Sequence, residues 1–299
     1  MSAASRPVVY GEVLFDRFPD GSTVLGGAPF NVAWHLQAFG RRPLFISRVG
    51  NDALGRDIRH WMQEWDMDSA GLQLDSAHPT GTVTVNFGAG GEPRFDIVND
   101  CAYDYIDAGV VPPVTPALFY HGTLILRNSG SAASLAMLRN KLGKPVFLDV
   151  NLRAPWWNRD TVAASLDGAD IVKLNEDELV LLLPEGAAPG DGARHLMQRH
   201  GIGRLIITRG ARGAVAMDRD GTSLEIDPGA AAPQVIDTVG AGDAFASIVI
   251  LGNLLGWPLQ ITMQRAQQFA SAIVSVRGAV VRDRDFYQPF INDWNLTAS

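Results

Sequence analysis

Short apolar runs alternate with helix-like segments through the second half of the chain, and this rhythm limits its fold more than any other feature. Beyond residue 110, we expect strands at 118–121, 146–150, 171–174, 204–208, 213–217 and 223–226. We expect helices at 131–142, 160–166, 191–200, 241–252 and 261–276. Strands that alternate with helices form βαβ units whose strands lie parallel. The sequence therefore predicts an α/β fold around a mostly parallel sheet.

The first half keeps part of this rhythm, with strands expected at 8–15 and 43–49 and helices at 30–39 and 57–65. Two segments depart from it. Residues 80–98 alternate apolar and polar side chains around a glycine-rich turn at 88–91, which is typical of a β-hairpin. Residues 16–25 also favour antiparallel β structure. We expect one domain over 1–299, with a small β-sheet lid formed by roughly 16–25 and 80–98.

Composition excludes several classes of protein. The net charge is −7, which argues against a nucleic-acid or anionic-membrane partner because such proteins carry a basic face. Cys101 is the single cysteine, so no intrachain disulfide forms, and no Cys/His cluster has zinc spacing. No apolar run has the length of a signal peptide or a membrane span. We therefore expect a cytoplasmic protein.

The most informative motif is Asp237-Thr238-Val239-Gly240-Ala241-Gly242-Asp243-Ala244-Phe245, which leads into an apolar helix. A helix start preceded by glycines exposes unpaired backbone N–H groups, and the helix dipole adds positive potential there. This arrangement is an anion hole. A carboxylate beside it repels phosphate, and general-base catalysis is a reason to place one there. Taken alone, Asp243 is better explained as the N-cap of a helix that follows a glycine turn.

A second motif lies near the start of the chain, at Gly26-Gly27-Ala28-Pro29-Phe30-Asn31-Val32-Ala33. Paired glycines let the backbone approach a ligand closely. Asn31 offers both a donor and an acceptor, which suits a sugar hydroxyl. Taken alone, this motif is also an ordinary turn followed by a helix.

Together, in this order, the two motifs resemble the two signatures of the PfkB (ribokinase-like) carbohydrate kinase family, and the resemblance extends over nearly the whole chain. Supporting segments are Gly11–Asp16, Val49–Gly55, Asp149-Val150-Asn151-Leu152-Arg153, Asn175–Glu178 and Thr208-Arg209-Gly210 with Gly213. Val150 replaces the proline usual in the fructokinase segment. The P-loop, the dinucleotide-binding fingerprint and the protein-kinase motifs are absent.

The resemblance implies a doubly wound, mostly parallel central sheet flanked by helices, with ligands at the carboxyl ends of its strands. It implies that Asp16, Gly27 and Asn31 bind the hydroxyls of a sugar, while Arg153 pairs with phosphate. Asp243 is then the base that takes the hydroxyl proton as the oxygen attacks in line. The amides of the segment Gly240-Ala241-Gly242-Asp243 stabilise the charge on the transferring phosphoryl group.

The resemblance also implies a site for ATP along the C-terminal half of the chain. Thr208, Gly210 and Gly213 belong to its nucleotide segment, and Ser271 falls near the adenine. Asn175 and Glu178 lie one helical turn apart and order Mg²⁺ through water. Asp237 and the backbone at 276–278 are a candidate site for an activating K⁺ ion. A helix cap with surface acids is the alternative for 175–178, and a surface role is the alternative for Arg153.

Within the family, the glycine pair with Ala28 and the Asn-x-Arg segment resemble fructokinases, so we expect ATP-dependent phosphorylation of fructose to fructose 6-phosphate. Ribokinases typically carry a lysine where this chain has Ala28. Ribose, 2-keto-3-deoxygluconate, other ketoses and nucleosides stay open as acceptors. A non-catalytic sugar or nucleotide sensor is a second class of function, although a sensor has no need of Asp243. Because lid sheets pair between subunits in this family, we expect a homodimer.

Overall fold

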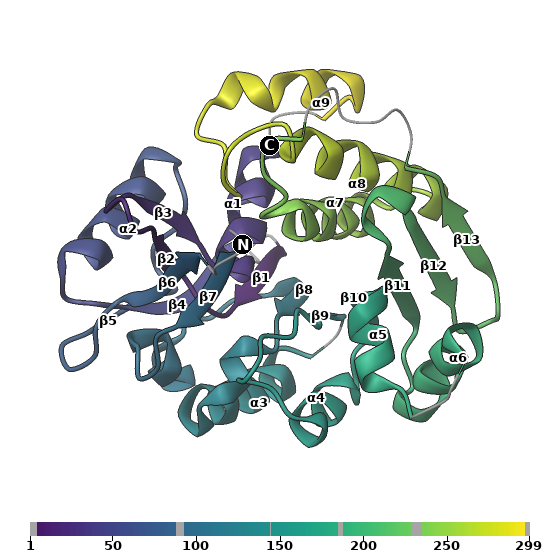
Figure 1. Cartoon of the computed structure of the whole chain (residues 1–299), viewed down its shortest axis with the longest axis horizontal. Helices are drawn as coiled ribbons and strands as arrows, with labels where there is room; N and C mark the ends of the chain where they lie inside the picture. Colours follow the sequence, from purple (N-terminus) through teal and green to yellow (C-terminus); the bar gives the residue numbers. More distant parts are fainter. Residues whose placement is uncertain (1–4, 88–92, 144, 185–187, 229–234, 297–299) are drawn as a thin grey trace.

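The structure is a computed structural model that describes residues 5–87, 93–143, 145–184, 188–228 and 235–296. Within these residues the strands form two separate sheets (Figure 1). The larger sheet has nine strands, in the order β13 (Ser223–Ile226), β12 (Ala214–Asp218), β11 (Arg204–Thr208), β10 (Ile171–Asn175), β9 (Val146–Asp149), β8 (Pro116–His121), β1 (Arg6–Tyr10), β4 (Leu44–Gly50) and β5 (Leu72–Asp75). Every neighbouring pair from β11 to β5 is parallel, whereas β12 pairs antiparallel with both β11 and β13.

Helices cover both faces of this sheet, as a doubly wound fold requires. One apolar core joins it to α1 (Ala28–Ala38), α2 (Ala53–Glu64), α7 (Ala241–Leu255), α8 (Leu259–Ile273) and α9 (Gln288–Asp293). The core on the other face joins it to α3 (Ser129–Leu142), α4 (Arg159–Leu166), α5 (Glu176–Leu182) and α6 (Pro189–His200). Short 3-10 helices lie at Ala102–Tyr105, Ala108–Val110, Leu124–Arg127, Gly210–Arg212 and Arg284–Phe286. The predicted fold class is confirmed.

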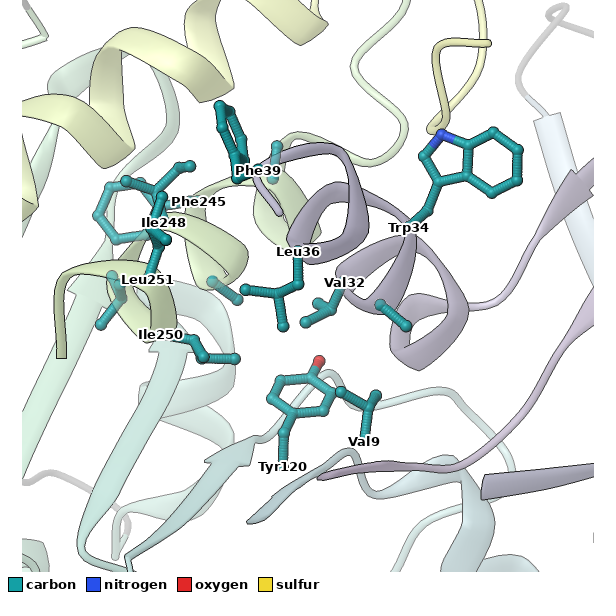
Figure 2. Packing of buried hydrophobic residues seen from close by; sticks show 14 of the residues in the cluster. Val9, Val32, Trp34, Leu36, Phe39, Tyr120, Phe245, Ile248, Ile250 and Leu251 are labelled. Carbon is teal, nitrogen blue, oxygen red and sulfur yellow. The ribbon is translucent and has the colours of Figure 1, made fainter. Parts of the chain in front are cut away.

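Burial on both faces explains why the strands read as continuous apolar runs. Val9 of β1 belongs to one core, whereas its neighbours Val8 and Tyr10 belong to the other. Figure 2 shows the first core from close by, where α1 and α7 lie side by side above Val9 and Tyr120 of the sheet. This packing brings together two helices from opposite ends of the chain, and each of them begins with one of the two sequence motifs.

The smaller sheet has four strands within the described residues, in the order β3 (Thr23–Gly26), β2 (Leu14–Arg17), β6 (Gly81–Phe87) and β7 (Pro93–Ile97). The smaller sheet predicted around 16–25 and 80–98 is thus present, and the glycine turn at 88–91 lies outside the described residues. Within the described residues, β3 and β7 are the edge strands of the smaller sheet, and exposed edges invite pairing. The homodimer predicted from such edges stays a prediction.

One sequence expectation at the start of the chain is wrong. The apolar run 8–15 forms two strands in different sheets rather than one, with the chain crossing from β1 to β2 at residues 11–13. Gly11 has φ 150°, and a Cβ there would lie 2.4 Å from Cγ of Pro29. The glycine therefore lets the chain leave the large sheet against the start of α1.

No helix of the described residues combines the length and the apolar character that crossing a bilayer requires.

Candidate active site

A cavity of about 540 Å³ lies at the carboxyl ends of the central strands, between the two sheets. Residues predicted to bind the acceptor line it, namely Asp16, Gly27 and Asn31, and so does Arg153, which was predicted to pair with phosphate. Residues predicted for the phosphates and the nucleotide line it too, namely Asn175, Glu178, Thr208, Gly210, Gly240, Gly242 and Asp243. Val83, Phe95 and Ile97 of the smaller sheet close one side with apolar surface. Ligands of open α/β sheets bind at this edge.

A direct contact joins the two motifs. Asn31 of α1 donates from Nδ2 to Oδ2 of Asp243 of α7 over 2.7 Å, although 212 residues separate them in the chain. The contact fixes the Asp243 carboxylate on the acceptor side of the cavity. Burial raises the pKa of Asp243 to about 6, with the Asn31 hydrogen bond and the charges of Lys173 and Arg153 opposing the rise.

The start of α7 presents free backbone donors beside this carboxylate. Gly240 precedes the helix at φ 82°, and a Cβ there would lie 2.4 Å from Cβ of Ala279. The Ala241 amide donates to Thr238 O over 3.4 Å. Among the described residues, the amides of Gly242 and Asp243 donate no backbone hydrogen bond. These two amides belong to the first turn of α7, and free amides at a helix N-terminus stabilise an anion.

Asp237 ties this loop to the segment that follows α8. Its Oδ1 accepts from the Val239 amide and its Oδ2 from the Gly278 amide, each over 3.0 Å. The carboxylate therefore holds the loop 237–240 against 276–279. Its predicted role at a K⁺ site stays a prediction.

Asn175 and Glu178 form a reciprocal cap at the start of α5. Asn175 Oδ1 accepts from the Glu178 amide over 2.8 Å, and Glu178 Oε2 accepts from the Asn175 amide over 2.9 Å. Glu178 Oε1 also accepts from the Leu152 amide over 2.7 Å, so it anchors the loop after β9. Burial raises the pKa of Glu178. The described residues hold no group of three or more His, Cys, Asp or Glu side chains arranged for a metal ion.

Four predicted site residues do not line the cavity, namely Gly213, Asp237, Ala241 and Ser271. Asp237 precedes the lining residues of the same loop, and Ala241 lies between the lining residues Gly240 and Gly242. Gly213, at φ 80°, packs against Ile226 O, where a Cβ would lie only 2.0 Å away, so its position is fixed by the sheet. Ser271 on α8 accepts from Gln267 of its own helix over 3.4 Å. The adenine role predicted for Ser271 stays a prediction.

Comparison with known proteins gives the family. The model of the pfkB family of carbohydrate kinases matches residues 6–283. This chain belongs to that family. A fructokinase of Klebsiella pneumoniae is 32% identical over 260 residues, covering 82% of this chain and 83% of the relative. An aminoimidazole riboside kinase of Salmonella typhimurium is 30% identical over 289 residues, covering 92% and 86%.

A solved structure gives the same answer. The fructokinase of Vibrio cholerae O395, crystallised with fructose, ADP and calcium, has a TM-score of 0.81 and 26% identity, with 95% of this chain and 98% of that chain covered. A double mutant of that enzyme was crystallised with fructose, ADP and potassium, with a TM-score of 0.80, 25% identity and coverage of 95% and 97%. The family and these relatives make this PfkB protein an ATP-dependent sugar kinase.

Three charged residues that line the cavity were not predicted as site residues from the sequence, namely Asp149, Lys173 and Glu12. Lys173 Nζ donates to both carboxylate oxygens of Asp149 over 2.9 Å, and both side chains are buried. Burial lowers the pKa of Lys173, but the charge and hydrogen bonds of Asp149, together with the charges of Asp243 and Glu178, outweigh burial, so the net pKa is raised. Lys173 Nζ lies 3.4 Å from the position of a Cβ on Gly242, so this cation lies beside the start of α7.

The cavity also gathers carboxyl groups whose pKa values are raised. Burial raises the pKa of Glu12 to about 7 and that of Asp16 to about 6, as it does for Asp243. The charge of Arg153 opposes the rise at all three acids. Groups with perturbed pKa values concentrate at functional sites. The sequence offered one signal for Glu12 and Lys173, since each is a lone charged residue inside an apolar run.

Proposed function

We propose that this PfkB kinase transfers the γ-phosphoryl group of ATP to a hydroxyl of fructose, giving fructose 6-phosphate. The hydrogen bond between Asn31 and Asp243 carries the proposal, because it holds a carboxylate of raised pKa between the acceptor motif and the free amides of α7. The fructokinase relatives and the fructose-bound structure support the choice of acceptor.

In this mechanism the acceptor lies between the smaller sheet and α1, with Asp16, Gly27 and Asn31 around its hydroxyls. Asp243 accepts the proton of the attacking hydroxyl as the new oxygen–phosphorus bond forms and the bond to ADP breaks. The Gly242 and Asp243 amides bind the equatorial oxygens of the phosphoryl group. Arg153, which has no carboxylate partner among the described side chains, supplies positive charge to the same space.

Mg²⁺ neutralises charge on the ATP phosphates when bound. Both carboxylate oxygens of Glu178 already accept backbone hydrogen bonds, so this side chain fits contact with the ion through water. The Asp237 carboxylate is likewise occupied by two amides. We therefore assign Glu178 and Asn175 to hold the metal-bound waters. We assign Asp237 and the backbone at 276–278 to the site of an activating K⁺ ion.

The pH dependence follows from the raised pKa of the base. Because protonated Asp243 does not accept a proton, we expect kcat/KM to fall about tenfold per pH unit below the pKa of about 6. Asp16 and Glu12 titrate in the same range, so the acid limb belongs to the group of acids rather than to one of them. A pH–rate profile at constant ionic strength measures this limb. A rate that stays level to one pH unit below that value would contradict the assignment.

The acceptor is tested by ADP release with Mg²⁺ and ATP on fructose, tagatose, ribose, 2-keto-3-deoxygluconate, adenosine and aminoimidazole riboside, each with and without K⁺. We expect the highest kcat/KM on fructose and a higher rate with K⁺ than with Na⁺. The Salmonella relative is named for its action on aminoimidazole riboside. Preference of this protein for that riboside would keep the mechanism and replace the acceptor. Binding without turnover on every compound would favour the sensor.

A further inference from the structure

Glu12 is a buried acid in the cavity to which the mechanism above assigns no contact with the acceptor or with ATP. It lies where the chain crosses from β1 to β2, its residue is 3% exposed, and it lines the cavity together with Asn31 and Asp243. Its Oε2 atom has no hydrogen-bond partner among the described residues. A buried carboxyl oxygen without a partner costs folding free energy, so its retention at this place needs an explanation.

The backbone fixes Glu12 against the acceptor motif. Gly27 has φ 106°, and a Cβ there would lie 2.7 Å from the carbonyl oxygen of Glu12. The bare Cα of Gly27 thus packs on the Glu12 backbone, next to the first residue of α1. The position of Glu12 is therefore set by main-chain packing. Its carboxyl group is not needed to hold the residue in place and is available to bind a ligand in the cavity.

A second buried acceptor in the same cavity is also unsatisfied. Asn31 donates to Asp243, but its Oδ1 atom has no partner among the described residues. Within the described part of the chain, two residues that line one cavity thus each hold a buried acceptor atom without a partner, and a ligand that carries several hydrogen-bond donors would satisfy both. Hydroxyl groups of a polyol meet this requirement. The charged groups that act on Glu12 are Arg153 and Arg127, which favour its ionised form, and Asp243, which opposes it.

We propose that Glu12 is a specificity-determining residue that accepts a hydrogen bond from an acceptor hydroxyl other than the one that is phosphorylated. The inference rests on the proposed function and deepens it, since it adds a second carboxyl group that selects the acceptor. Loss of such a contact leaves a buried acceptor unpaired, so a sugar that lacks this hydroxyl is discriminated against.

The test compares the wild type with Glu12→Gln, which keeps the shape, and with Glu64→Gln, a matched change on the exposed face of α2. Each protein is assayed on the preferred acceptor and on its monodeoxy analogues, with KM for ATP and the melting temperature measured in parallel. We expect Glu12→Gln to raise the acceptor KM about tenfold or more, as for other hydrogen bonds to a charged group, with the ATP KM and the Glu64→Gln values unchanged.

The analogues identify the hydroxyl. One monodeoxy analogue should be poor for the wild type and suffer no further loss in Glu12→Gln, because the contact is already missing. The melting temperature of Glu12→Gln should equal or exceed that of the wild type, since a buried acid is removed. A lower melting temperature with an unchanged acceptor KM would assign Glu12 a purely structural role.

The two proposals fail in different ways. If the wild type phosphorylates a sugar and Glu12→Gln has the same acceptor KM on every analogue, the inference is wrong and the kinase assignment stands. Calorimetric titration of the wild type with each sugar separates the other case. A wild type that neither binds nor phosphorylates any sugar on the panel would overturn the proposed acceptor class and the role of Glu12 with it.

Discussion

Replacing Asp243 by asparagine is expected to lower kcat about 100-fold or more, because a positioned general base contributes roughly 10²- to 10⁴-fold to proton-transfer steps. The amide keeps the size of the side chain, and its oxygen still accepts from Nδ2 of Asn31. The loss therefore falls on proton acceptance rather than on the fold of the site. Steady-state ADP release on the preferred acceptor gives kcat and both KM values for the comparison.

Two controls make this result specific. Asp57→Asn changes an exposed acid on α2 and should leave every constant unchanged. The melting temperature of Asp243→Asn should not drop, because burial of the acid already raises its pKa and disfavours the charged form. The acid limb attributed to the group of cavity acids should shift or flatten in this variant. A loss of kcat below about tenfold would mean that the hydroxyl loses its proton by another route.

The sequence predicted the large sheet because its strands are buried on both faces and therefore appear as uninterrupted apolar runs. It did not predict β5, since Leu72–Asp75 has only four residues, mixes polar and apolar side chains and lies at an edge of the sheet. It joined β1 and β2 into one strand because both are apolar, and composition does not reveal the change of sheet at Gly11.

For the site, the resemblance of the motifs to the family signatures predicted most of the residues that the cavity brings together under those roles, including Asn31 and Asp243. Other buried residues of the cavity, two of them inside the supporting segments, were missed because their roles depend on burial and on partners distant in the chain. Asp149 and Lys173 lie on adjacent strands, and their pairing follows only from the parallel register that places Lys173 beside Asp149. Glu12 was missed for a related reason, since an unpartnered carboxyl oxygen is a property of the folded site.

The second large effect concerns stability. Replacing Lys173 by methionine is expected to lower the free energy of unfolding by about 3–5 kcal/mol, because the buried carboxylate of Asp149 is left without its cation. Lys173 Nζ contacts both oxygens of Asp149, and the Tyr120 hydroxyl, 3.4 Å from Oδ2, is a weak additional donor. Urea unfolding followed by circular dichroism measures the change, with Lys141→Met on the exposed end of α3 as the matched control.

The double variant Lys173→Met with Asp149→Leu separates the pair from simple packing. Replacing a buried ion pair by apolar side chains of similar volume is often neutral or stabilising, so the double variant should recover most of the lost free energy. Its kcat should stay below that of the wild type, because the cation beside Gly242 is gone. A double variant as unstable as the single one would show that Lys173 stabilises the fold through its packing. Recovery of both stability and kcat would show that the ion pair has no role in phosphoryl transfer.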